Sequence, residues 1–270
     1  EACYNMIVRN CIFFSYVPGN FDRGIHVSLF SDPANSILLY NNVVADVKIS
    51  GIVMHDITTG TVLLRNNVVS NHPGAPAAME RLRIDAPLIG FLTDGTLVRS
   101  GAALSLSGWA KPVAEPEIAV YIGNDLSEGS DRETTRAAIA SIGPAIELAD
   151  VDFPPEDVEA ILAGNVYNRH VIFGRADSSR AGCVLDGLAG RVYRNGKEVA
   201  ATTDPQAVTG DIIDIVRHIA DLLAALGERL RAGEMVITGS IVPPLWIESK
   251  EEIRFTLDPI DTVSINLRPA

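Results

Sequence analysis

A short apolar run at residues 118–122 follows two acidic residues and ends at a turn signal at residues 123–125, which predicts a buried strand. The two acids, Glu115 and Glu117, are two positions apart, so their side chains point to the same face of that strand. A third acid, Glu147, lies inside another apolar stretch. Carboxylates gathered at the edge of a hydrophobic element repel one another, and burial strengthens the repulsion. The pattern therefore favours a cation between them.

A hard divalent cation, Mg²⁺ or Mn²⁺, suits such a place because it takes oxygen ligands. Three carboxylates from two strands would leave coordination positions open for water and a substrate. The simpler alternative is two exposed acids at the start of a strand. Spacing alone leaves that alternative open, because Glu-x-Glu is a common pattern.

Other periodicities predict helices, a hairpin and strands. Residues 211–231 predict one long amphipathic helix. Residues 154–164 predict a short helix that begins with two prolines and ends at a glycine. Residues 192–199 predict a hairpin around an Asn-Gly turn, and residues 236–238 and 263–267 predict strands. The apolar face of the long helix comprises Ile212, Ile215, Val216, Ile219, Leu222, Leu223, Leu226 and Leu230.

The first part of the chain carries an internal repeat. The segment that starts at Ile7 aligns with segments that start at Leu38 and Leu63, at spacings of 31 and 25 residues. Each repeat has short strands broken by turns, so residues 5–71 resemble a fragment of the right-handed parallel β-helix of pectate-lyase-like proteins. An ordinary β-meander is the alternative.

Stacked β-helix coils would place Asn10, Asn41 and Asn66 above one another as a ladder of side-chain amides. The acidic residues of this part do not cluster in the repeat register, so we find no polysaccharide-lyase chemistry in it. We expect a scaffold or a carbohydrate-binding segment.

Composition changes abruptly near residues 71–75, which predicts two domains, residues 1–73 and 74–270. The first holds 9 Asn and 3 Ala, whereas the longer second part holds 5 Asn and more than twenty Ala. The net charge of −12 makes nucleic acid and anionic membranes poor partners. The 3 cysteines form no zinc or redox motif, so a reducing cytoplasmic location fits best.

Six motifs of the second part occur in one order, and together they resemble the 2-keto-4-pentenoate hydratase family of the fumarylacetoacetate-hydrolase-like superfamily. The resemblance covers about residues 74–268. The motifs are GAPAAM at residues 74–79, PLIGFLTDG at 87–95, KPVAEPEIA at 111–119, PAIEL at 144–148, NVYNRHVIFG at 165–174 and RAGEMVITGS at 231–240.

The resemblance implies a mainly β fold with α-helices (α+β), in which a mixed, strongly curved β-roll is flanked by helices. It implies that Glu115, Glu117 and Glu147 bind Mg²⁺ or Mn²⁺, which would chelate a small-molecule 2-oxo acid. It assigns proton transfer to Asp94 as the catalytic residue, with a plain turn role as the alternative. It also implies homo-oligomers. The residues that it places at the substrate are Asn165, Asn168, Thr238 and Ser240.

The implied activity is that of a carbon–oxygen lyase, a metal-dependent hydratase that adds water to a 2-hydroxy-2,4-dienoate in the catabolism of aromatic compounds. A 2-oxo-enedioate decarboxylase of the same family is the alternative. One departure casts doubt on turnover. The family carries a Lys in a Gly-x-Lys-x-Gly segment where residues 69–73 stand here, and helices where the repeats stand. A catalytically inactive fusion, natural or artefactual, therefore remains a third interpretation.

Overall fold

The structure is a computed structural model that describes two stretches of the chain. Within residues 6–70 it describes the backbone of strands alone; from residue 87 to residue 269 it describes the chain except residues 153, 155–157 and 226–227. The chain forms two units, residues 1–66 and 67–270. β8 (Asn67–Ser70) belongs to the second unit because it pairs with β9 (Ile89–Leu92). The division into domains at residues 73 and 74 stays a prediction.

In the first unit, equivalent strands of the sequence repeat pair in parallel. The register joins Ile7 to Leu38 and Leu38 to Leu63, the positions that the repeat aligned. The amide ladder of Asn10, Asn41 and Asn66 lies outside the described residues, so it stays a prediction, as does the β-helix. The pairs are β1 (Met6–Arg9) with β4 (Ser36–Tyr40), β4 with β7 (Thr61–Leu64), β2 (Ile12–Phe14) with β5 (Val43–Ala45), and β3 (Arg23–Phe30) with β6 (Ser50–Ile57).

Two β-sheets dominate the second unit, which is a mixed α/β fold. The first has the strand order β10 (Leu97–Val98), β14 (Asn168–Phe173), β13 (Ile139–Asp150), β12 (Pro112–Ile122), β17 (Met235–Ser240), and β18 (Leu245–Trp246) also pairs with β12. The second has the order β11 (Ala103–Ser105), β20 (Asp261–Arg268), β19 (Glu252–Asp258), β15 (Ala189–Arg194), β16 (Lys197–Thr202).

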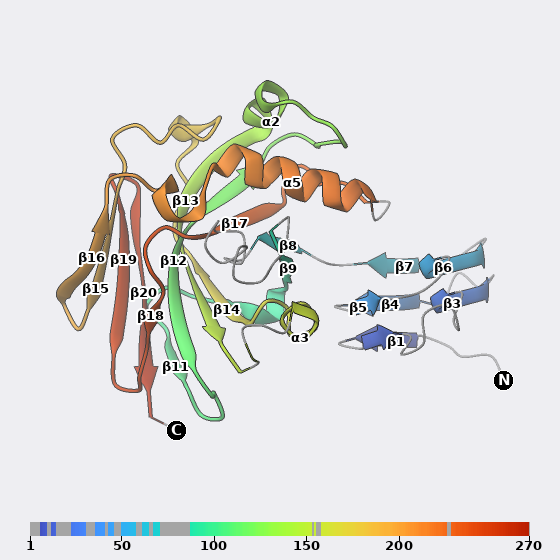
Figure 1. The fold of residues 1–270 in the computed structure, drawn as a ribbon, viewed down its shortest axis with the longest axis horizontal. Helices are drawn as coiled ribbons and strands as arrows, with labels where there is room; N and C mark the ends of the chain where they lie inside the picture. Colours follow the sequence, from blue (N-terminus) through green and yellow to red (C-terminus); the bar gives the residue numbers. More distant parts are fainter. Residues whose placement is uncertain are drawn as a thin grey trace. The chain divides into compact units, whose positions relative to one another are not determined.

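The two sheets pack against each other, with β19 and β20 in contact with β13 (Figure 1). The hydrophobic core fills the space between them, because one face of each strand is apolar: Ile118 and Val120 of β12 lie in the same buried cluster as Phe255 of β19 and Val263 of β20. The opposite face of β12 carries Glu117. The sheet that supplies the acids is thus held rigid by a core on its other side.

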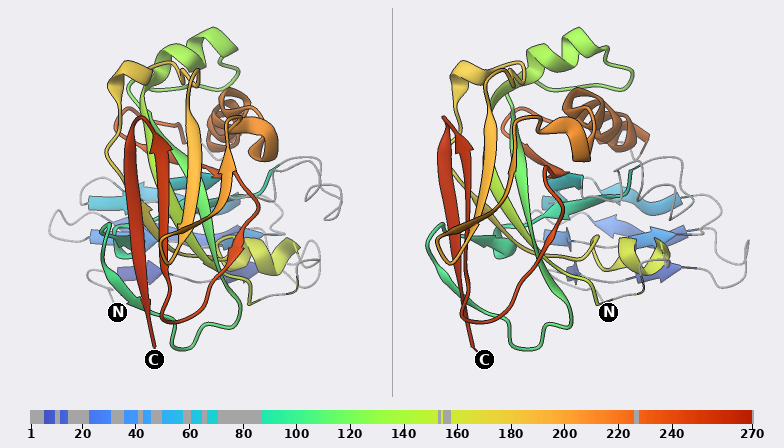
Figure 2. Two further views of the ribbon diagram at one scale, coloured as in Figure 1. Left: turned by 90° about the vertical axis from the view of Figure 1, so that its left-hand side faces the viewer. Right: turned by 60° about the vertical axis from the view of Figure 1, so that its left-hand side comes forward.

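Helices flank the sheets, as the two further views of Figure 2 show. The longer helices, α2 and α5, lie side by side (Figure 1) and are joined by Arg132, which forms ion pairs with Asp211 and Asp214. Within the described residues, none of the helices has the length and apolar character needed to span a bilayer. The helices are α2 (Arg132–Ala138), α3 (Val158–Ala163), α4 (Gln206–Thr209) and α5 (Ile212–Ala225), with 3₁₀ turns η2 (Asp94–Thr96) and η3 (Ser178–Arg180).

The predicted long helix is real but shorter than expected. Its stripe is buried at Ile212, Ile215, Val216 and Ile219, whereas the helix ends at Ala225 instead of residue 231. Leu230 is still buried, because it forms a β-bridge with Leu126 rather than a turn of helix. Helical spacing therefore continued by coincidence into a segment that the core holds in another conformation.

Leu222 is a second correction to that helix. It is exposed, although the sequence pattern assigned it to the apolar stripe. The predicted hairpin is confirmed: β15 and β16 are joined by Asn195 and Gly196, both at positive φ, as a two-residue hairpin turn requires.

Candidate metal centre

Three carboxylates converge on one face of the first sheet. Glu115 of β12 is the direct register partner of Glu147 on the antiparallel strand β13, and Glu117 lies two residues along β12 on the same face. One oxygen from each of the three lies within 4.8 Å of the others. Two oxygens that bind one divalent ion are at most about twice the metal–oxygen distance apart, roughly 4–5 Å. The three oxygens are therefore close enough to share a single ion.

These carboxylates are buried, with 7%, 0% and 0% of Glu115, Glu117 and Glu147 exposed. Each keeps an oxygen that has no hydrogen-bond partner among the described residues: Oε2 of Glu115, Oε1 of Glu117 and Oε2 of Glu147. A buried carboxylate without a partner is costly, so proteins pair it or give it a metal. The free oxygens on three strand-held acids fit a hard divalent cation such as Mg²⁺ or Mn²⁺.

The surroundings of the three acids raise their pKa values. Burial raises the pKa of Glu115 and of Glu117 well above the ordinary value, and the nearby charge of Glu147 raises both further. Burial also raises the pKa of Glu147, to about 7, against the opposing effect of the hydrogen bond from Asn168. Without an ion the site therefore disfavours ionisation of these acids, whereas a bound cation would favour it.

The remaining oxygens of two acids are fixed by neighbours. The backbone N–H of Gly239 donates to Oε2 of Glu117 at 2.7 Å, and Nδ2 of Asn168 donates to Oε1 of Glu147 at 2.6 Å. Gly239 reaches Glu117 because the pairing of β12 with β17 shifts register beside Glu117, and Gly239 adopts φ 87° there. Such an irregularity re-aims backbone groups, and glycine tolerates the positive φ.

An apolar floor adjoins the carboxylates on the same sheet face. It consists of the buried residues Leu92, Ala119, Ala145, Val171 and Ile237. Ala145 is the register partner of Glu117, and Ala119 is the next residue of β12 on that face. The small side chains of Ala119 and Ala145 leave space above the sheet beside the acids, and the surrounding apolar groups make that space less polar.

The hydroxyl groups predicted to bind substrate are engaged with the backbone. Oγ1 of Thr238 donates to the carbonyl of Ile118 at 3.1 Å, and Oγ of Ser240 donates to the carbonyl of Val242 at 2.7 Å. Both residues are buried and flank Gly239, so they hold in place the backbone that contacts Glu117. Their roles toward substrate stay predictions.

The two predicted asparagines do different work. Asn165 pairs its amide with both backbone groups of Phe91, accepting from the N–H at 2.8 Å and donating to the carbonyl at 2.9 Å. It thereby fixes β9, the strand that carries Leu92 of the apolar floor. Asn168 instead contacts the acid Glu147. The residues from 165 to 167 all have positive φ, so this tight turn sets the direction of both side chains.

Asp94, the predicted catalytic residue, lies exposed in η2, two residues after Leu92. It is therefore close in sequence to a residue of the apolar floor, but its role in proton transfer stays a prediction. Sequence reasoning missed the contributions of Gly239 to Glu117 and of Asn168 to Glu147. The available signals were a glycine between two polar strand residues and an amide at the start of an apolar strand.

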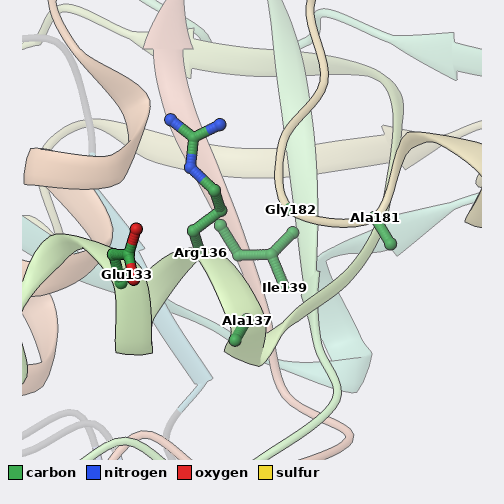
Figure 3. Close-up of a pocket in the computed structure, with 6 residues that line it drawn as sticks. All are labelled: Glu133, Arg136, Ala137, Ile139, Ala181 and Gly182. Atoms are coloured by element: carbon green, nitrogen blue, oxygen red, sulfur yellow. The ribbon is translucent and has the colours of Figure 1, made fainter.

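A surface hollow elsewhere on the second unit is separate from the acids. Its walls come from α2 and the turn after η3 (Figure 3), and they include Ile139 at the start of β13. Ile139 is eight residues from Glu147 along that strand, about 26 Å in an extended chain. The lining residues are Glu133, Arg136, Ala137, Ile139, Ala181 and Gly182.

Comparison with known proteins defines the class to which this site belongs. Residues 66–267 match the fumarylacetoacetate (FAA) hydrolase C-terminal family, and the chain belongs to that family. It is 28% identical over 191 residues to 2-hydroxyhexa-2,4-dienoate hydratase of Comamonas testosteroni, covering 69% of this chain and 72% of that protein. It is 24% identical over 198 residues to 2-keto-4-pentenoate hydratase 1 of Dechloromonas aromatica, covering 70% and 72%.

A solved structure supports the same class. The 4-oxalocrotonate decarboxylase from Pseudomonas putida G7, complexed with magnesium and adipate, aligns with a TM-score of 0.66 at 26% identity, over 75% of this chain and 78% of that one. The same enzyme has also been solved with calcium and acetate. The fold predicted for the second part of the chain is thus confirmed as fumarylacetoacetate-hydrolase-like.

The raised carboxyl pKa values predict how metal-free stability depends on pH. In the unfolded chain these acids ionise near the ordinary pKa of 4.5, whereas burial in the folded protein raises the pKa of all three. The contribution of these acids to the free energy of unfolding should be highest below about pH 4.5 and should fall as the pH rises toward about 7. For Glu147 alone, a shift from 4.5 to about 7 corresponds to a fall of about 3 kcal/mol.

Urea unfolding in EDTA between about pH 5 and pH 8 measures this fall. Glu147→Gln should flatten the profile, because it removes the charge that must be buried. Glu133→Gln, a change at an exposed residue, should leave it unaltered. Equal slopes for the wild type and Glu147→Gln would show that burial of this acid does not govern stability.

Mn²⁺ binding should depend on Glu117. The change Glu117→Gln keeps the shape of the side chain and removes one anionic ligand, so Mn²⁺ affinity should fall by at least about tenfold. Metal-free stability should not decrease, because like-charge repulsion is relieved. Calorimetric titration measures the affinity, with Glu133→Gln as the control; unchanged affinity in Glu117→Gln would exclude this residue as a ligand.

Proposed function

We propose that this chain is a divalent-metal-dependent lyase of aromatic-compound catabolism, a hydratase that adds water to a 2-hydroxy-2,4-dienoate or its 2-oxo-4-enoate tautomer. The observation that carries the proposal is the cluster of three buried carboxylates that lie close enough to share one ion, each with an oxygen that has no hydrogen-bond partner among the described residues. Relatives named as dienoate and pentenoate hydratases support it, as does a solved relative that contains magnesium. The substrate is a small 2-oxo acid.

Glu115, Glu117 and Glu147 would hold Mg²⁺ or Mn²⁺. When bound, the ion supplies Lewis-acid polarisation of the carboxylate and 2-oxo oxygens of the substrate. Gly239 and Asn168 hold the outer oxygens of two of these acids. The protein thereby fixes the donor set before substrate arrives, which is the preorganisation that stabilises developing enolate charge.

Residues around the acids would position the substrate and move protons. The hydroxyl groups of Thr238 and Ser240 already donate to backbone carbonyls, so each can only accept a hydrogen bond from a substrate hydroxyl. The apolar floor beside them would exclude water from the carbon chain. Asp94 would carry the proton between oxygen and carbon during ketonisation of the dienol, before water adds to the conjugated double bond.

Decarboxylation of a 2-oxo-enedioate is the second candidate reaction. It is favoured by the likeness to 4-oxalocrotonate decarboxylase, which is 27% identical over 191 residues in Pseudomonas putida and has the solved structure described above. Both reactions need a metal-held 2-oxo acid. They differ in whether the substrate carries a second carboxylate, so the substrate decides between them.

Residues 1–73 form a β-helix-like scaffold or carbohydrate-binding domain, and residues 74–270 the catalytic domain, working as a homo-oligomer in the cytoplasm. The parallel strand pairs of the first unit are consistent with stacked coils. Exposed strand edges of such coils favour self-association. A single monomeric species in light scattering, over a wide range of concentrations, would contradict the oligomer.

An assay with two substrates separates the candidate reactions. With Mg²⁺ and 2-hydroxypenta-2,4-dienoate, we expect loss of the diene absorbance without release of carbon dioxide. Release of carbon dioxide from 2-oxohex-3-enedioate, at a higher kcat/KM than dienoate turnover, would replace the hydratase with the decarboxylase. Turnover of neither substrate by protein that binds Mn²⁺ would establish the inactive fusion, consistent with the missing family Lys.

A further inference from the structure

One polar side chain beside the acids has a contact that neither the hydratase nor the decarboxylase reaction explains by itself. Asn168 opens β14 and is 6% exposed, so it is as buried as the acids. Its Nδ2 donates to Oε1 of Glu147 at 2.6 Å, whereas its Oδ1 has no hydrogen-bond partner among the described residues. A buried amide with only half of its hydrogen bonds made is unusual, because such groups are generally satisfied.

The contact has a directional consequence for Glu147. A donor that holds one oxygen of a carboxylate restricts rotation of the group and therefore narrows the directions open to its second oxygen. The oxygen of Glu147 without a hydrogen-bond partner among the described residues is Oε2, and an oxygen of Glu147 lies within 4.8 Å of an oxygen of Glu115 and of Glu117. Backbone pairing alone does not set this direction, because the side chain of a glutamate rotates about three bonds.

Glu117 and Glu147 are oriented in different ways. Glu117 is held by the backbone N–H of Gly239, which belongs to the sheet itself. Glu147 is held by a side chain instead, and this side chain follows directly after the left-handed turn of residues 165–167. The N–H of Asn168 donates to the carbonyl of Asn165 at 3.1 Å, which fixes the start of the strand. The turn thus sets the position of the residue that donates to Glu147.

We propose that Asn168 is a positioning residue that orients Glu147 for the metal ion, a role beyond the substrate contact that the family resemblance predicts. The inference rests on the proposed metal centre and extends it to a residue outside the donor set. Ligand affinity commonly depends on such neighbours, whose replacement lowers metal affinity by about 10–100-fold. The free Oδ1 leaves the amide one acceptor for an O–H group brought to the site.

Two substitutions of nearly equal size test the role of the donor. Asn168→Ala removes it, whereas Asn168→Ser keeps an O–H that can donate to Glu147. We expect Mn²⁺ affinity, measured by the electron paramagnetic resonance signal of free Mn²⁺, to fall by about tenfold or more in Asn168→Ala. Asn168→Ser should recover part of that loss. The spectrum of bound Mn²⁺ should also change in Asn168→Ala, because it reports ligand geometry and not stability.

A control separates positioning from general destabilisation. Thr135→Val removes a buried hydroxyl of the same unit, which donates to the carbonyl of Asp131 and not to the acids. It should lower thermal stability without altering Mn²⁺ affinity or the spectrum. If Asn168→Ala binds Mn²⁺ as tightly as the wild type does, the donor role is wrong. If the wild type binds no Mn²⁺, the proposed metal centre itself fails, so the two failures are distinguishable without any turnover assay.

Discussion

The burial of three carboxyl groups side by side, those of Glu115, Glu117 and Glu147, is the constraint on which the site in the second unit depends. Three acids that are at most 7% exposed cannot all be ionised side by side without a counter-charge. The antiparallel pairing of β12 and β13 nevertheless forces Glu115 opposite Glu147, and the two-residue period brings Glu117 to the same face. The fold thus maintains an arrangement that opposes its own stability, which is typical of a functional site.

The surrounding structure makes this arrangement possible. The opposite face of β12 and β13 packs into the large core between the two sheets, with Ile118 and Ile146 fully buried. That packing prevents the strands from separating to relieve the repulsion. On the acidic face, Gly239 and Asn168 each stabilise the negative charge of one carboxylate by donating a hydrogen bond to it. Both donors lie at backbone irregularities, a register shift and a left-handed turn, where regular strands could not have aimed them.

Local rules were enough to find the acids but not their neighbours. The alternation of a strand predicts that Glu115 and Glu117 share a face, and the apolar setting of Glu147 predicts burial; the structure brings all three together. The register that sets Glu147 opposite Glu115 depends on pairing between distant segments, which no local pattern specifies. For the same reason, the sequence did not predict that the amide of Asn168 contacts an acid 21 residues earlier in the chain.

Limits of periodicity appear elsewhere as well. The helical stripe from Ile212 to Ile219 is correct because it packs on the sheet, but Leu230 shares the spacing and is buried by a β-bridge. Tertiary contacts override local preference at such element ends. The hairpin at Asn195 and Gly196 was predictable because its turn chemistry is wholly local. The family resemblance added what the spacing alone left open, namely whether these acids bind a metal ion or lie exposed at the start of a strand.

The most direct test of the metal centre is anomalous diffraction from crystals grown with Mn²⁺. We predict one strong anomalous peak on the acidic face of β12 and β13, at roughly 2.0–2.6 Å from an oxygen of each of Glu115, Glu117 and Glu147. An anomalous map without a peak there, with the three carboxyl groups hydrogen-bonded to one another in well-ordered density at neutral pH, would contradict the account.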